Sequence, residues 1–357
     1  MSGLFRLLRA QYSPPKDPKN VSFAGKTIVL TGATSGLGFE AAIKFLNLGV
    51  DTLVIGSRSL DHGYAAKTEL ETRTNRPDVV QVWELEMGNY QSIKRFADRV
   101  DTELGQLDIA LLNAGLWNRD YAVSPEGWEE TLQVNTLSTT LLAFLLLPKL
   151  RDSSSTSTPG HLTVVSSQQF VRVKAASLRT DDALLKHLND ARHFAGPKQY
   201  GISKLLLEYM MKTAANRVRN ENRTLPVIIN TVSPGLCASS LGRTYNRFYE
   251  RCLVWLLYKL FARTAEQGSR SLVSATYQGV ESHGRCWRSD GYLEYVSCFL
   301  SLCFLLSLML MALPSESAAL TMGSEGKQFE GQAWREVLGV LREQAGEVDE
   351  IVGEEYL

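Results

Sequence analysis

The 357-residue chain has 38 basic residues (Lys and Arg) and 38 acidic residues (Asp and Glu), so its formal net charge is zero. This length can bury the core of one large α/β domain or of two small ones. The charge balance lacks the basic surplus that nucleic-acid binding requires, so no nucleic-acid partner is expected. The five cysteines form no CxxC pair, which argues against disulfides and a metal site and predicts a cytoplasmic protein.

Residues 1–22 contain two arginines, a short apolar patch and three prolines. They lack the continuous apolar core of a secretory signal. We interpret them as an N-terminal arm, with an amphipathic membrane contact as the alternative.

A glycine-rich turn at 31–38 lies between an apolar run at 27–30 and a segment at 39–46 whose apolar residues recur at helical spacing. Helix N-termini carry unpaired N–H groups and partial positive charge, so they hold phosphate. Glycines let the backbone approach a pyrophosphate closely. The residues expected to bind a dinucleotide here are Gly32, Ser35, Gly36, Leu37 and Gly38.

The end of the second expected strand bears on the choice of cofactor. In dinucleotide folds an acidic residue here binds the ribose 2′-hydroxyl, whereas an arginine suits a 2′-phosphate. Asp and Glu are absent from 52–60, and Arg58 is present. The sequence therefore predicts NADP(H) rather than NAD(H).

Apolar runs alternate with helical patterns along the chain. Strands are expected at 52–56, 79–85, 107–112, 161–165 and 227–232, and helices at about 60–75, 90–104, 128–150, from 199 and at 264–277. This alternation predicts βαβ units and a Rossmann-type, doubly wound parallel sheet with both faces covered. We place a single α/β domain at 23–294, followed by a C-terminal extension.

Tyr200 and Lys204 lie four residues apart on one expected helix, hence on one face and one turn apart. A free tyrosine, with a pKa near ~10, is a poor acid or base at neutral pH, and a nearby ammonium group lowers that pKa. Ser167 follows the fifth strand and can hold a substrate oxygen beside the tyrosine hydroxyl; Ser166 stays open as the alternative. The set suits carbonyl reduction, which needs a hydride donor and a proton donor.

Six motifs stand in one order: residues 31–38, Asn113-Ala114-Gly115, Asn135, Ser167, Tyr200-x-x-x-Lys204 and Pro234-Gly235. From about Phe23 to Tyr292 the chain thereby resembles the short-chain dehydrogenase/reductase family. Within it, the insertion 170–197 and the segments 264–268 and 282–284 most resemble the retinol-dehydrogenase-like branch found in fungal genomes.

The resemblance implies a role for each motif residue. Tyr200 would be the general acid/base. Lys204 would lower the pKa of Tyr200 and bind the nicotinamide ribose. Ser167 would position the substrate, and Asn135 would be part of a proton relay. Cofactor contacts are implied for Asn113, Ala114, Gly115, Tyr200 and Pro234, for Glu86 at the adenine in place of the usual aspartate, and for Cys237 and Ser239 beside the nicotinamide.

A substrate lid is expected at about 236–263, where aromatic residues and arginines interleave. An apolar lid suits a lipophilic substrate, so we expect an NADP(H)-dependent oxidoreductase acting on a carbonyl or alcohol, as in a tailoring step of fungal secondary metabolism. The alternatives are a membrane-associated retinol- or steroid-type dehydrogenase and a non-catalytic NADP-binding regulator. The sequence leaves open whether the protein forms an oligomer.

The segment 295–313 is almost wholly apolar and approaches the ~20 residues of a membrane span. Arginines precede it and acidic residues follow it, which suits an anchor on the cytosolic face. A retained intron and a buried or lid helix are the other interpretations. Residues 314–357 are expected to form a polar, partly helical tail.

Overall fold

The computed structural model describes residues 13–155, 158–218, 225–238, 241, 259, 262–293, 320–321 and 323–352. The first twelve residues of the expected arm, Ser239, most of the expected lid and the whole of 295–313 lie outside these residues. The predictions made for those segments therefore stay predictions.

An eight-stranded sheet forms the centre of the molecule, in the order β3-β2-β1-β4-β5-β6-β7-β8. The strands are β1 (Thr27–Thr31), β2 (Thr52–Ser57), β3 (Val80–Glu84), β4 (Ile109–Leu112), β5 (Gly160–Val165), β6 (Val227–Val232), β7 (Cys286–Arg288) and β8 (Gly291–Tyr292). All neighbours are parallel except β7 and β8, which pair antiparallel. The predicted Rossmann-type parallel sheet is confirmed.

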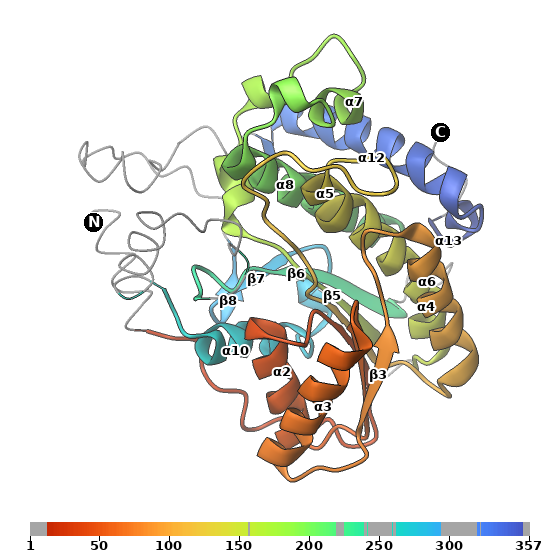
Figure 1. The fold of residues 1–357 in the computed structure, drawn as a ribbon, viewed down its shortest axis with the longest axis vertical. Helices are drawn as coiled ribbons and strands as arrows, with labels where there is room; N and C mark the ends of the chain where they lie inside the picture. Colours follow the sequence, from red (N-terminus) through yellow and green to blue (C-terminus); the bar gives the residue numbers. More distant parts are fainter. Residues whose placement is uncertain are drawn as a thin grey trace.

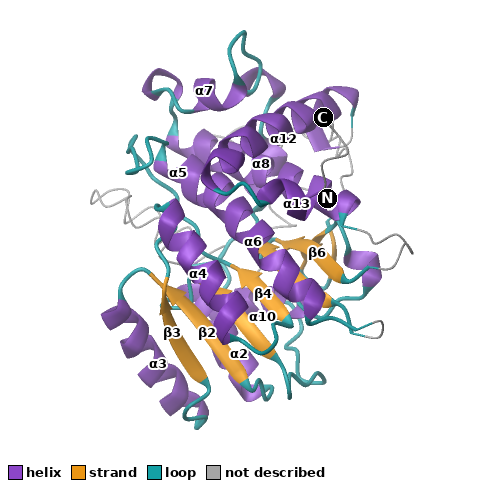
Figure 2. Ribbon diagram, turned by 90° about the vertical axis from the view of Figure 1, so that its right-hand side faces the viewer, coloured by secondary structure: helices purple, strands orange, loops and turns teal. Residues whose placement is uncertain are grey.

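Two layers of helices explain why the central strands are buried and mostly apolar. One layer contains α2 (Gly36–Asn47), α3 (Leu60–Thr74) and α10 (Ala265–Ala275). The other contains α4 (Tyr90–Glu103), α6 (Thr139–Asp152) and α8 (Gly196–Arg217), as Figures 1 and 2 show. Each layer has its own buried apolar cluster, and every residue of β1, β4 and β6 is buried between them.

The helix expected at 128–150 is divided into three parts. It begins with α5 (Glu130–Leu132), continues as a π-helix (Gln133–Ser138) and becomes α6. Among the described residues, one helix, 130–152, is long enough and apolar enough to cross a membrane. However, 89% of its most apolar window is buried inside the fold. It is packed as the core helix of a globular domain is.

The insertion between β5 and α8 folds into short helices: η2 (Gln168–Arg172), η3 (Ala175–Ser177), α7 (Leu184–Leu188) and η4 (Ala191–His193). A further 3-10 turn, η6 (Val280–Ser282), precedes β7. The insertion meets the C-terminal helix α12 (Ser324–Gln344), whose Glu336 carboxylate accepts hydrogen bonds from the amides of Leu184 and Leu185.

The described part of the expected polar tail is a packed element of the fold. Helix α12 and the short α13 (Val348–Val352) lie beside α7, α8 and α6, on the side away from α2 and α3 (Figure 1). The apolar face of α12, which includes Phe329, Trp334 and Leu341, belongs to the larger core cluster.

Candidate active site

The glycine turn after β1 is built for a close approach of the backbone. Gly32 and Gly36 have φ angles of +66° and +59°, in the left-handed region that favours glycine. A Cβ atom on Gly38 would lie 2.2 Å from the carbonyl oxygen of Gly32. The turn thus places the first amides of α2 at the carboxyl edge of the sheet, as a phosphate site requires.

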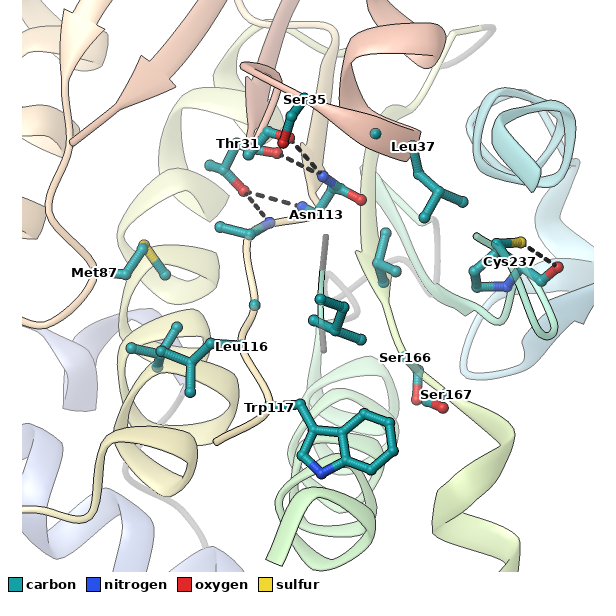
Figure 3. A pocket seen from close by; sticks show the side chains of 18 of the residues that line it. Thr31, Ser35, Leu37, Met87, Asn113, Leu116, Trp117, Ser166, Ser167 and Cys237 are labelled. Carbon is teal, nitrogen blue, oxygen red and sulfur yellow. Dashed lines mark hydrogen bonds between the residues drawn. The ribbon is translucent and has the colours of Figure 1, made fainter. Parts of the chain in front are cut away.

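Asn113 holds this turn from the neighbouring strand. Its side-chain amide donates hydrogen bonds to the carbonyl oxygens of Thr31 (3.1 Å) and Gly32 (3.0 Å). The hydroxyl of Thr31 in turn accepts from the backbone amides of Asn113 and Ala114, both at 2.9 Å (Figure 3). Asn113 therefore couples the end of β4 to the cofactor turn.

A cavity of about 560 Å³ opens at the carboxyl ends of the strands. It brings together most of the predicted site residues: Gly32, Ser35, Gly36, Leu37, Arg58, Glu86, Asn113, Ala114, Gly115, Ser167, Tyr200, Lys204, Pro234 and Cys237. Gly38 and Asn135 do not line it; Gly38 closes the turn behind the wall, and Asn135 is fully buried. Ser239 lies outside the described residues.

Helix α8 carries Tyr200, Lys204 and Glu208 at intervals of four residues, so their side chains follow one face. The Lys204 ammonium donates to the carbonyl oxygen of Val165, 2.8 Å away at the end of β5. Burial lowers the pKa of Lys204 to about 8, against the opposing effect of the nearby Glu208. A buried amine with this pKa can release or hold a proton close to neutral pH.

Glu208 is a buried carboxyl one helical turn beyond the lysine. Its Oε2 accepts a hydrogen bond from the Thr231 hydroxyl at 3.0 Å. Burial raises the pKa of Glu208, while the hydrogen bond from Thr231 and the charge of Lys204 act in the other direction. The residue extends the polar face of α8 into the core.

Ser166 and Ser167 both line the cavity at the end of β5 (Figure 3). Ser166 is only 2% exposed, whereas Ser167 is half-buried. The Ser167 hydroxyl accepts a 3.3 Å hydrogen bond from the amide of Gln169 and can still donate its own proton. Its greater access favours Ser167 as the residue that contacts a substrate.

Asn135 lies in the π-helix and acts through its neighbours. Its side-chain oxygen accepts from the Leu116 amide at 2.9 Å, and its amide group donates to the Leu116 carbonyl at 2.8 Å and to the Ser203 hydroxyl at 3.1 Å. The amide thus joins the β4 loop to α8 between Tyr200 and Lys204. The expected role in a proton relay stays a prediction.

Arg58 and Glu86 lie at the cavity end formed by β2 and β3. The Arg58 side chain is 72% exposed, and its Nε lies 3.6 Å from Glu86 Oε2. A pair so open to solvent is weak, so the guanidinium is available to an anionic ligand. Glu86 also accepts a 2.9 Å hydrogen bond from the Gly88 amide, which fixes its carboxylate.

Comparison with known proteins identifies the family. A family model described as short chain dehydrogenase matches residues 26–176. Over 350 residues the chain is 42% identical to the short-chain dehydrogenase/reductase phmF of the fungus Phaeosphaeria nodorum, covering 98% of this chain and 95% of that protein. The chain belongs to the short-chain dehydrogenase/reductase family.

Further relatives agree with this assignment. The short-chain dehydrogenase/reductase ffsI of Aspergillus flavipes is 39% identical over 347 residues, which cover 97% of this chain and 94% of that one. A solved short-chain dehydrogenase of Shigella flexneri complexed with NADP has a TM-score of 0.55 and 20% identity, and the match covers 76% of this chain and 100% of that chain. These names do not address the retinol-dehydrogenase-like branch, which stays a prediction.

Cys237 lies where this short-chain dehydrogenase/reductase was expected to hold a nicotinamide, but its thiol is inert. The Sγ atom donates a long hydrogen bond of 3.5 Å to the Pro234 carbonyl. Burial raises the pKa of Cys237 to about 12, against the nearby charge of Arg263. At neutral pH the thiol stays protonated and is a poor nucleophile.

Sequence reasoning missed several residues that line the same cavity. Trp117 stacks on the ring of Tyr200, with ring centroids 5.2 Å apart and planes at 21°. Its place two residues after Gly115, at the carboxyl end of β4, was a signal that could have found it. Arg172 and Arg288 also line the cavity; they come from the insertion and from a strand too short to be predicted.

Proposed function

We propose that the protein is an NADP(H)-dependent oxidoreductase that interconverts a carbonyl and a primary or secondary alcohol on a lipophilic small molecule. The observation that carries this proposal is that Ser167, Tyr200 and Lys204 line the same cavity as the glycine turn. Family membership supports the reaction class, and the structural neighbour bound to NADP supports the cofactor class.

The residues present fit this cofactor at both ends. The left-handed glycines and the close packing at Gly38 leave room for a pyrophosphate against α2. Arg58 suits the 2′-phosphate, and no acidic side chain competes on its own strand end. When bound, the nicotinamide would donate or accept the hydride.

The chain's own groups would handle the proton. In the reductive direction the Tyr200 hydroxyl donates a proton to the forming alkoxide, and the Lys204 ammonium stabilises the tyrosinate that results. The Ser167 hydroxyl would hold the substrate oxygen beside that tyrosine. The stack of Trp117 on Tyr200 fixes the ring in place.

Apolar side chains support a lipophilic substrate. Leu116 and Trp117, which follow β4, form an apolar wall of the cavity beside Tyr200 (Figure 3). A tailoring step in fungal secondary metabolism is the role we propose, because the relatives are fungal proteins of nearly the same length. We also propose a cytoplasmic location, with attachment to the cytosolic face of a membrane through 295–313 as the alternative. A retinol- or steroid-type molecule is the alternative substrate.

A panel of apolar ketones, aldehydes and alcohols, each assayed with NADPH/NADP⁺ and NADH/NAD⁺, tests this function. Nicotinamide absorbance would report turnover. We expect turnover with the phosphorylated cofactor and with apolar carbonyls. Tight NADPH binding without turnover of any substrate would favour the non-catalytic regulator instead.

A further inference from the structure

The cavity has two ends, and the strand order separates them. Arg58 lies at the end of β2, on one side of the glycine turn of β1. Arg172 follows β5 in the helix η2, and Arg288 ends β7, both on the other side of that turn. A dinucleotide with its 2′-phosphate at Arg58 and its pyrophosphate at the turn would therefore extend toward Ser167 and Tyr200, and Arg172 would lie beyond its phosphates.

Arg172 is placed beside the reacting groups by the packing of η2 on α8. A Cβ atom on Gly201, the neighbour of Tyr200, would lie 3.2 Å from the Gln169 carbonyl. This close contact leaves η2 little freedom to move away from the tyrosine. The guanidinium of Arg172 thus belongs to the substrate end of the cavity.

The guanidinium of Arg172 is half-buried and has little to neutralise it. Its one hydrogen bond among the described residues is a 3.5 Å contact from Nη1 to the amide oxygen of Gln169. No carboxylate forms an ion pair with it within the described ranges. Burial lowers the pKa of Arg172, which reflects the cost of holding an unneutralised cation away from water.

Two other arginines that line the cavity differ in this respect. Arg58 lies beside the Glu86 carboxylate. Arg263 donates to the Ser289 hydroxyl at 2.8 Å and to the Pro234 carbonyl at 3.3 Å. A guanidinium can form five N–H donations in a fixed fork that matches a carboxylate, and most of those of Arg172 are unused within the described part of the chain.

We propose that Arg172 binds a carboxylate of the substrate, so that the enzyme acts on lipophilic carbonyl compounds or alcohols that carry an acid group. This inference rests on the proposed function, since it concerns the substrate of that same site. The apolar wall holds the body of such a molecule, and the guanidinium holds its charged end. The two contacts together would orient the reacting carbonyl toward Ser167 and Tyr200.

The test compares the binding of acids with that of their esters. A chain-length series of ω-phenylalkanoates and their methyl esters would be titrated by calorimetry into the full-length enzyme with NADP⁺ present. The variants are Arg172→Met and Arg172→Lys, and the matched control is Lys174→Met, which removes an exposed cation two residues away. NADPH binding would be measured for each variant.

We expect the wild type to bind the best acid at least about tenfold more tightly than its ester, as a charge-assisted hydrogen-bonded pair provides. Arg172→Met should remove this preference while leaving ester and NADPH binding unchanged. Arg172→Lys should keep part of it, and Lys174→Met should behave as the wild type does.

Four results would overturn the inference. They are equal binding of acid and ester by the wild type, an equal loss of both in Arg172→Met, a loss of the acid preference in Lys174→Met, and weaker NADPH binding in Arg172→Met. Because the readout is binding, it is independent of turnover. An Arg172-dependent preference for acids in a protein that neither reduces a carbonyl nor oxidises an alcohol would uphold the carboxylate site and reject the oxidoreductase.

Discussion

At the scale of single residues, Arg58 carries our proposal that the cofactor is NADP(H). Among the described residues, its exposed guanidinium has a 3.6 Å contact to Glu86. We predict that Arg58→Ala raises the KM for NADPH by about tenfold or more, because a charge-assisted contact to the 2′-phosphate is lost. The KM for NADH should stay the same or fall.

Steady-state kinetics with both cofactors would check this prediction. Arg95→Ala, which removes an exposed arginine of α4, is the control. A similar loss with NADPH and NADH would mean that Arg58 acts on the fold rather than on the phosphate.

Lys204 gives the reaction a pH dependence. Burial lowers its pKa to about 8, so the amine is charged below that pH and neutral above it. The charged form stabilises the tyrosinate and favours proton donation, so kcat/KM for carbonyl reduction should be flat near neutrality and fall as the pH rises through about 8.

A profile of kcat/KM against pH in the reductive direction measures this alkaline fall. The informative comparison is Lys204→Arg, whose guanidinium stays charged throughout. Whatever activity that variant keeps should lack the alkaline fall. If kcat/KM of the variant falls at the same pH as that of the wild type, another group causes the titration.

At the scale of elements, helix α12 packs against α8, the helix that carries Tyr200 and Lys204. Trp334 is 4% exposed, packs with a ring-centroid distance of 5.9 Å against Phe144 of α6, and lies under the Arg217 guanidinium of α8 at 4.5 Å. We predict that Trp334→Ala lowers the free energy of unfolding by about 3–5 kcal/mol, because it leaves a large cavity between three helices.

Chemical denaturation of Trp334→Ala and of the control Arg335→Ala would test this prediction. Arg335 is the exposed neighbour on the same helix, so its loss should change the free energy of unfolding little. If the two substitutions cost the same, α12 is not part of the cooperative core.

Elements with a strong local pattern could be predicted from the sequence. The strands β1, β2, β4, β5 and β6 are mostly apolar because both faces of the sheet are covered. The glycine turn and the Tyr200–Lys204 pair are recognisable from their own spacing. The π-helix at 133–138 could not be predicted, because its sequence is equally compatible with an α-helix.

Other elements depend on contacts between distant parts of the chain. Strands β7 and β8 have three and two residues, too few to show a period. The docking of α12 on α7 and α8 joins residues more than a hundred positions apart, such as Glu336 and Leu184. Arg172 reaches the cavity only because the insertion folds back on α8, and no local pattern encodes this.

At the scale of the whole molecule, a half-buried histidine links stability to pH. Burial, with a smaller effect of Lys26, lowers the pKa of His161 on β5 to about 4. The unfolded chain takes up a proton near pH 6.5 and the folded chain only near 4, so stability falls as the pH drops through this window. The full loss is about 3 kcal/mol.

Denaturation midpoints at neutral pH and near pH 5 would reveal this linkage. His161→Leu removes the titrating group and should flatten that part of the stability profile. An equally steep profile in the variant would show that carboxylates, rather than this histidine, cause the loss of stability in acid.

The central claim is that the Tyr200 hydroxyl donates the proton in carbonyl reduction. The measurement is turnover of the best carbonyl substrate by Tyr200→Phe, together with the Kd for NADPH. The ring of Phe keeps the stack on Trp117 but lacks the hydroxyl, so turnover should fall by about a thousandfold while NADPH binding stays nearly unchanged. A Tyr200→Phe enzyme that reduces the substrate at close to the wild-type rate would contradict it.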